Sequence, residues 1–327
     1  RVVDKMRRQR ENRKHVRVII SLSLCLLMIM TIGYAAFSTN LTLTAKGNIK
    51  TLITIDQLKN KSVTTGEGLY QSTSQENRYI YKGAKPNNYI KFNDELWRII
   101  AIENDNTLKI MRNKKLDNDL AFDSINNRAQ STNTFCLENQ GCNVWGAVDG
   151  IYSNASKIGT VTKDSSLNTY LNTDYYDNLS STAKELIINH EYNVGAVNYI
   201  ESETFENLLE QESKIKWNGK IGLISVSDYL NASLNNKCTN VKSAVLSGGN
   251  NCANLNYMYI KDQYYTWLIN PYYDNQYRSW FIFHDRGDLD MNSYVVSEET
   301  AVVPVLFLKS DIKLMGSGTE TDPYIIK

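Results

Sequence analysis

The chain has 327 residues, 42% of them hydrophobic and 10% aromatic, which is enough for one large or two modest domains and too apolar for a wholly disordered protein. Its formal net charge of +1 hides an asymmetry, because residues 1–17 carry eight Lys and Arg against two acidic residues and leave 28 basic and 33 acidic residues for the rest. That acidic remainder argues against nucleic acid as a partner of the main body.

Residues 1–17 form a basic segment in front of an uncharged run that extends from Val18 to Ala45. The most apolar part, residues 18–37, is about as long as a helix that crosses a bilayer core. Because the positive flank comes first, we expect the amino end in the cytoplasm and the rest of the chain outside. Two alternatives stay open: a single-pass anchor in the cell membrane, or a signal helix cleaved near Ala36, which would give a secreted protein. The chain begins with Arg rather than Met, so we expect its native start to lie upstream.

Residues 38–75 are polar and rich in Ser, Thr, Asn and Lys, with one short helix expected near residues 54–60. We interpret this segment as a stalk. It would connect the membrane or signal helix to an extracytoplasmic domain at residues 76–327.

A β-meander is predicted at the start of that domain. Residues 89–92 and 95–102 form two β-type runs separated by Asn93 and Asp94, a pair that favours a tight hairpin turn. A third strand is expected to return at residues 107–112, after the next turn.

The remaining elements are short and mixed. We expect helices after the capping residues Ser165, Thr182 and Ser227 and an amphipathic helix at 203–213. Strands are predicted at 220–225, 266–269, 279–284 and 302–308. Scattered short helices and strands with long loops indicate the α+β class.

Four cysteines lie outside the apolar run, which contains the fifth. An even number in an exported body favours disulfides, and we expect the local pairs Cys136–Cys142 and Cys238–Cys252. A zinc site is the alternative, but it favours closer cysteine spacing or histidine ligands, and neither is present.

Several segments, in chain order, resemble a group of uncharacterised surface proteins of Gram-positive gut bacteria. They are YKGA (81–84), NNYIKF (87–92), LWRII (96–100), GCNVW (141–145), SLNTYLN (166–172), GLISVSDY (222–229), Trp267, VVPVLFLKS (302–310) and GTETDPY (318–324). That group is similar to the C-type-lectin-like fold in its formylglycine-generating-enzyme-like branch. The resemblance implies a C-type-lectin-like α+β domain whose last strand closes near its first, with ligand-binding loops before the final strands, here at about 263–300. The enzyme branch uses a close cysteine pair, whereas Cys136 and Cys142 differ from it in place and spacing, so we do not carry that activity over.

The aromatic and polar side chains in this region are the predicted ligand-binding residues, because tyrosine and tryptophan supply rigid contact area with a polar tip. They are Tyr264, Tyr265, Tyr272, Tyr273, Tyr277, Trp280, His284 and Arg286. Trp97 and Trp267 are assigned to the core instead, since each lies inside an apolar strand pattern.

Asp285, Asp288 and Asp290 would offer hard oxygen ligands to Ca²⁺. Their spacing does not match an EF-hand, and a solvated turn is the alternative interpretation. No other cofactor is indicated.

No nucleophile elbow, zinc-protease helix or phosphate-binding loop occurs in the sequence. We therefore expect a non-catalytic, adhesin-like cell-surface protein that recognises a glycan or protein. The alternatives are an extracytoplasmic hydrolase that uses a carboxylate pair and a structural envelope protein.

Overall fold

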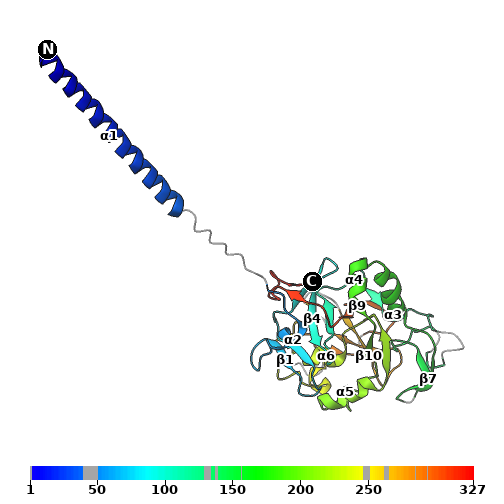
Figure 1. The fold of residues 1–327 in the computed structure, drawn as a ribbon. Coiled ribbons are helices and arrows are strands. Elements are labelled where there is room, and N and C mark those ends of the chain that lie inside the picture. The colour runs from blue at the N-terminus through cyan, green and yellow to red at the C-terminus, as the bar shows by residue number, and fades with distance from the viewer. Residues whose placement is uncertain are drawn as a thin grey trace. The chain divides into compact units, whose positions relative to one another are not determined.

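The computed structural model divides the chain into two units, which are described separately (Figure 1). The first unit, Arg1–Ile49, contains the helix α1 (Val2–Thr39), and the second, Lys50–Lys327, contains the other elements. The structure describes residues 2–39, 51–128, 134–136, 139–155, 157–245, 251–260, 265–283, 285–292 and 294–327.

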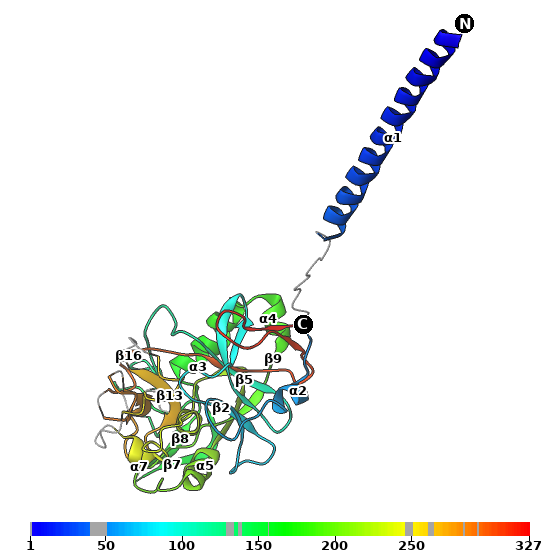
Figure 2. The ribbon, with the colours of Figure 1, turned by 90° about the vertical axis from the view of Figure 1, so that its left-hand side faces the viewer.

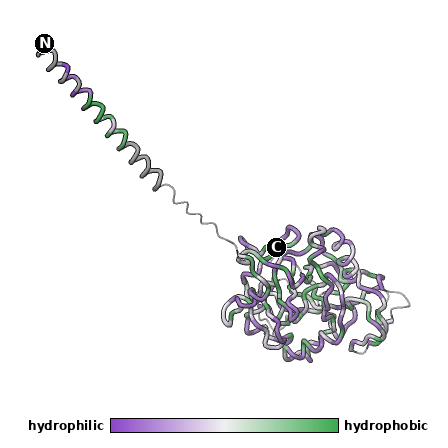
Figure 3. Tube along the Cα trace, viewed as in Figure 1, coloured by the Kyte–Doolittle hydropathy of each residue, from purple (hydrophilic) through white to green (hydrophobic). Residues whose placement is uncertain are grey.

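Helix α1 joins the basic segment and the apolar run in one continuous element. Figure 3 shows hydrophilic residues near its start followed by hydrophobic ones. Its large apolar side chains between Val18 and Met28 are more than half exposed. Of the residues that the structure describes, none forms a helix long and apolar enough to cross a membrane. The side chains of residues 29–39 lie outside that description, so the transmembrane or signal helix at 18–37 stays a prediction.

The second unit is built on a curled, mostly antiparallel sheet with the strand order β12-β17-β5-β4-β3-β19-β18. Three further strands join it at the side, because β2 pairs with β4, β1 with β2, and β9 with β17. The strands are β1 (Gly68–Gln71), β2 (Tyr79–Lys82), β3 (Tyr89–Phe92), β4 (Glu95–Ile102), β5 (Leu108–Arg112), β9 (Ile187–Ile188), β12 (Ile221–Gly222), β17 (Val305–Leu308), β18 (Leu314–Met315) and β19 (Tyr324–Ile326).

The predicted meander is confirmed as β3, β4 and β5. Asn93 and Asp94 form the turn with φ of 50° and 60°, the left-handed conformation that tight hairpins require. Phe92 and Trp97 flank this turn and pack edge to face, with ring centroids 5.3 Å apart.

The two ends of the compact unit meet at the main sheet. Strand β19 lies parallel to β3, and Ile53 pairs with Leu314, the first residue of β18. Helix α2 (Ile55–Lys59) also packs against the compact unit, because Ile55 and Leu58 are buried in the core. Residues 51–75 therefore fold with the body, unlike the stalk predicted at 38–75, because a few apolar side chains among the polar ones reach the core.

Short helices connect the strands. They are α3 (Ser166–Tyr170), the π-helix η1 (Leu171–Tyr175), α4 (Ser181–Leu186), α5 (Phe205–Ser213), α6 (Val226–Asn231) and α7 (Val241–Ala244). Ser165 caps α3 as predicted, but Ser180 rather than Thr182 caps α4, and Ser225 rather than Ser227 caps α6. The α6 cap is set by a reciprocal bond between Ser225 and Asp228, which requires the cap to lie three residues before the aspartate.

Among the described residues, four small sheets complete the unit. They are β6 (Leu120–Ala121) with β16 (Glu299–Thr300), β7 (Val148–Asn154) with β8 (Lys157–Val161), β10 (His190–Asn193) with β11 (Lys216–Gly219), and β13 (Thr266–Pro271) with β14 (Ser279–Ile282) and β15 (Leu289–Asp290). Figure 2 shows β13 well separated from α2 and the carboxyl end. The strand predicted at 220–225 shrinks to β12, because the chain turns there into the cap of α6.

The core contains four tryptophans, Trp97, Trp145, Trp267 and Trp280, none more than 1% exposed. The core assignments of Trp97 and Trp267 are confirmed. The surface assignment of Trp280 is wrong, because its flanking turns enclose a short strand, β14, whose four residues are all buried.

Both predicted disulfides are present. Cys136 is bonded to Cys142, and Cys238 to Cys252. The first bridge packs with Phe135, Val144 and Tyr152 in a small second core beneath β7 and β8, while the second bridge lies in the main core.

Candidate functional site

Three of the predicted ligand-binding tyrosines lie on one turn, residues 272–278, which connects β13 to β14 and is called the tyrosine loop here. Tyr272, Tyr273 and Tyr277 are all half-buried, so each residue keeps part of its surface exposed to solvent. Asp274 is exposed among them. The loop thus offers aromatic, amide and charged groups on seven consecutive residues, YYDNQYR.

A buried asparagine holds the tyrosine loop from inside. The Nδ2 atom of Asn143 lies 3.1 Å from the carbonyl oxygen of Tyr272 and 2.7 Å from those of Asn275 and Arg278. Its backbone N–H donates to the carbonyl of Gln276 at 2.9 Å. Asn143 is 0% exposed, so the donor side of these bonds is shielded from water. The loop backbone is therefore fixed by the body of the protein, which leaves the tyrosine side chains available.

The segment 194–202, called the tether segment here, holds the loop from one side. The N–H of Val197 donates to Pro271, and the carbonyl of Val197 accepts from the N–H of Tyr273 at 3.1 Å and from the indole of Trp280 at 3.1 Å. Asn154, at the end of β7, also donates to the carbonyl of Tyr272 at 3.1 Å. The loop backbone is thus hydrogen-bonded both to the tether segment and to the end of β7.

The hydroxyl of Tyr272 donates to Asp274 at 3.1 Å, and its ring packs edge to face on Trp280. Partial burial, together with the Asp274 carboxylate, raises the pKa of Tyr272 to about 12. The hydroxyl therefore stays protonated near neutral pH, and with its proton donated to Asp274 its oxygen can still accept a hydrogen bond from a ligand.

The other predicted binding residues do not join this loop. Tyr265 lies at the opposite end of the β13–β14 pair, where its ring packs against Phe281 and Tyr294. Arg286 also lies beyond β14, with its Nε 3.4 Å from the carboxylate of Asp288. Tyr264 and His284 fall outside the described residues.

The three predicted calcium ligands differ in burial and in hydrogen-bond partners. Asp285 is exposed, whereas Asp288 is buried and accepts from the N–H of Cys252 at 3.0 Å. Burial raises the pKa of Asp288, against the hydrogen bond from Cys252 and the charge of Arg286. Asp290 accepts from the backbone of the two residues that follow it. In the part of the chain that the structure describes, no three His, Cys, Asp or Glu side chains group as metal ligands, and the calcium site stays a prediction.

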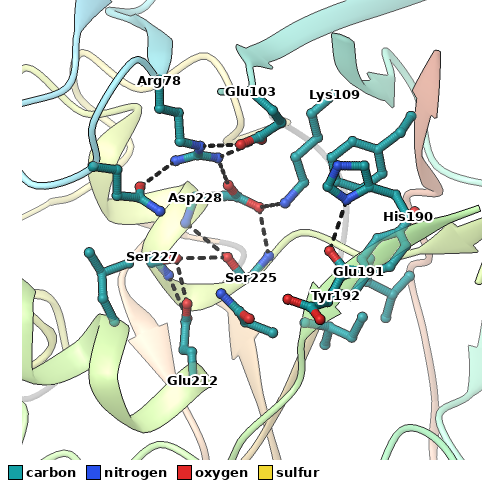
Figure 4. Close-up of a pocket in the computed structure, with 16 residues that line it drawn as sticks. Arg78, Glu103, Lys109, His190, Glu191, Tyr192, Glu212, Ser225, Ser227 and Asp228 are labelled. Carbon is teal, nitrogen blue, oxygen red and sulfur yellow. Dashed lines mark hydrogen bonds and ion pairs between the residues drawn. The ribbon is translucent and has the colours of Figure 1, made fainter. Parts of the chain in front are cut away.

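A second feature, absent from the sequence expectations, is a small cavity lined by charged side chains (Figure 4). Its volume is about 70 Å³. Its walls come from strands of the main sheet, from strand β10 of a smaller sheet, and from the helices α5 and α6. The polar and charged lining residues are Gln75, Arg78, Glu103, Lys109, His190, Glu191, Asn193, Glu212, Ser225, Ser227 and Asp228.

Asp228 is the centre of the ion pairs at this cavity. Its carboxylate lies 3.0 Å from Nη2 of Arg78 and 2.5 Å from Nζ of Lys109. The Arg78 guanidinium also pairs with Glu103 at 2.8 Å. Burial works to raise the pKa of Asp228, but the charges of Lys109 and Arg78 outweigh it and lower that pKa to about 2.

Glu212 lines the same cavity in a different setting. Its two carboxyl oxygens accept from the N–H of Ser227 at 2.8 Å and from the Ser227 hydroxyl at 2.5 Å. No Lys, Arg or His among the described residues forms an ion pair with it. Burial therefore raises the pKa of Glu212 to about 7, even though the bonds from Ser227 favour the ionised form.

The cavity suits a few water molecules better than a substrate. Ligand pockets usually measure about 300–1,000 Å³, several times the volume found here. The carboxylate of Asp228 is occupied by two cations, which leaves it poorly placed for acid–base work on a sugar. The charged groups at the cavity join the main sheet to α6, and this arrangement indicates a structural role.

Comparison with family models matches residues 148–310 to a family described as "Domain of unknown function (DUF6273)". The match begins at the first residue of β7 and ends just after β17, so it contains the tyrosine loop, α5 and α6. Comparisons with curated proteins and with solved structures found no match. These findings name no organism and no lectin-like fold, so that part of the resemblance stays a prediction.

Proposed function

We propose that this protein is a non-catalytic, adhesin-like binding protein that recognises a glycan or a protein through the tyrosine loop. The observation that carries the proposal is the way Asn143 holds the loop: one buried amide lies within bonding distance of three loop carbonyls. Such bonding fixes the backbone before a ligand arrives.

Fixing a loop in advance favours binding because less conformational entropy is lost when the ligand docks. Tyrosines suit such a surface, since each offers a large rigid area with few rotatable bonds and one polar group. Tyr272, Tyr273 and Tyr277 together provide that chemistry, and Asp274 with Arg278 adds one charge of each sign.

The C-type-lectin-like fold is part of the proposal. It is supported by the pairing of β19 with β3, which closes the end of the unit near its first long hairpin. The position of the tyrosine loop before the last strands of the main sheet agrees with the expectation from the resemblance. A likeness to surface proteins of Gram-positive bacteria is proposed on the same sequence segments.

We further propose that the compact unit functions outside the cell, anchored in the membrane by residues 18–37 or released after cleavage. Support comes from the basic segment 1–17 in front of the uncharged run and from the exposed apolar side chains of α1. The two disulfides also suit an oxidising compartment.

The experiment is a binding screen with the purified full chain on an array of glycans and an array of immobilised proteins. For any ligand captured, we expect the double variant Tyr272→Ala, Tyr273→Ala to lose at least tenfold in affinity. Its melting temperature should change little, because both residues are only half-buried.

The matched control is the double variant Tyr70→Ala, Tyr176→Ala, which removes two half-buried tyrosines from other elements. Equal losses of affinity in the two variants, or full binding by the loop variant, would contradict the proposal.

A further inference from the structure

We propose that Glu212 is a pH-sensitive latch for the tyrosine loop: its protonated side chain keeps the loop fixed, and its ionisation loosens it. The inference rests on the proposed function, because it concerns the regulation of the same binding surface.

The first step is the setting of Glu212. The side chain is 1% exposed and lies in the last turn of α5, where the helix dipole disfavours a negative charge. Only Ser227 donates to its carboxyl oxygens among the described residues. A buried carboxyl in this position is stable when it carries a proton, and burial raises its pKa to about 7.

The second step concerns the charged side chains that face Glu212. The surrounding elements contribute Arg78 just before β2, Glu103 just after β4, Lys109 from β5, His190 and Glu191 from β10, and Asp228 from α6. Asp228 opposes ionisation of Glu212, and Lys109 favours it. His190 and Glu191 have partners of their own, Asp105 at 3.6 Å and Lys216 at 2.7 Å.

The charges of Arg78 and Lys109, the cations paired with Asp228, are already balanced. Arg78 and Lys109 carry two positive charges, and Glu103 and Asp228 carry two negative charges. An ionised Glu212 therefore adds one buried negative charge without a cation of its own. The free-energy cost of burying this charge falls when the end of α5 moves toward water, where the carboxylate is hydrated.

The third step is the connection from α5 to the loop. The backbone carbonyl of Glu212 accepts from the N–H of Gly195 at 2.8 Å. The neighbouring Gln211 accepts from the N–H of Asn198 at 2.7 Å and donates to Ser202 at 3.0 Å. The end of α5 thus holds the tether segment at three points.

The tether segment in turn holds the tyrosine loop. Val197, between Gly195 and Asn198, donates to Pro271 and accepts from Tyr273. A displacement of the end of α5 therefore acts on the loop through two sets of hydrogen bonds.

Proton linkage sets the size of the effect. With a pKa of about 7 when the latch is closed and 4.5 when it is open, the equilibrium for opening rises roughly 25-fold between pH 5.5 and pH 8. The raised pKa means that the protonated, closed form is favoured at low pH and lost as the pH rises through 7.

The experiment is amide hydrogen exchange on the full chain at several pH values from 5.5 to 8, with each rate expressed relative to that of an unstructured peptide at the same pH. We expect protection in residues 194–202 and 271–278 to fall about 25-fold over this range. Glu212→Gln keeps an acceptor for Ser227 and has no proton to lose, so its protection should stay constant.

The matched control is Glu210→Gln, an exposed carboxyl on the same helix, which should behave as the wild type. Constant protection in the wild type would overturn the proposal. A pH effect that stays in α5 and α6, or one that persists in Glu212→Gln, would also overturn it. Because no ligand is used, this result is independent of the binding test with Tyr272 and Tyr273.

Discussion

Asp228 provides the sharpest test of the electrostatics, since one carboxylate joins two buried cations. In Asp228→Asn the side chain keeps its shape but loses its charge, and Arg78 and Lys109 retain only Glu103 as a counter-charge. Breaking a buried pair by removing one partner costs about 3–5 kcal/mol. We expect a loss of that size in the free energy of unfolding at pH 6, measured by urea denaturation with tryptophan fluorescence.

The same carboxylate predicts how the loss depends on pH. Its pKa is about 2 in the folded protein, against 3.8 for an unperturbed aspartate. Because the folded pKa is lower, the stabilisation is complete above pH 3.8 and disappears as the pH falls through 2. The difference corresponds to about 2 kcal/mol. The stability gap between wild type and Asp228→Asn should therefore shrink by about 2 kcal/mol from pH 6 to pH 2.

Other carboxyls also titrate in this range, so only the gap between the two proteins is diagnostic. Asp149→Asn, on an exposed position of β7, serves as the control and should follow the wild type at every pH. A gap for Asp228→Asn that is independent of pH would refute the assignment of its charge to this network.

Three further changes test the loop and the core. Asn143→Ala should cost about 2 kcal/mol, because it removes a buried amide donor that lies within bonding distance of three loop carbonyls, and amide exchange should show faster opening of residues 272–278. Replacing Cys238 and Cys252 by serine should lower the unfolding free energy by about 3 kcal/mol in urea, the value expected for a loop of this length. Trp280→Ala should cost about 3–5 kcal/mol and lower the melting temperature, since the indole is fully buried, whereas a surface tryptophan would cost far less.

Sequence patterns predicted the features that depend on residues close together in the chain. The hairpin of β3 and β4 follows from alternating apolar residues around Asn93 and Asp94, and the disulfides follow from short cysteine spacings. Capping residues were harder to place, because several serines precede each helix and only the reciprocal bond to Asp228 selects Ser225. Trp280 was misassigned for a related reason: turn-forming residues mark where a strand ends but not which way it faces.

The features that define the candidate site depend on contacts distant in sequence. Asn143 reaches carbonyls more than a hundred residues later, and Arg78 meets Asp228 across 150 positions. Nothing near either residue distinguishes it from a solvated asparagine or a surface arginine. Only the folded unit brings these groups together, so sequence analysis found the tyrosines of the loop but neither the asparagine that holds them nor the charged cavity.

The matched family region and the folded unit have different limits, and the difference bears on how the loop is held. Residues 148–310 contain the tyrosine loop, the tether segment, Glu212 and Asp228. The counter-charges of Asp228, which are Arg78 and Lys109, and the anchor Asn143 come from outside that region. Strand β17 is also paired to β5, which lies outside it. The region alone would leave Asp228 without its cations and the loop without its inner bonds, so the geometry on which the proposed binding depends belongs to the whole compact unit.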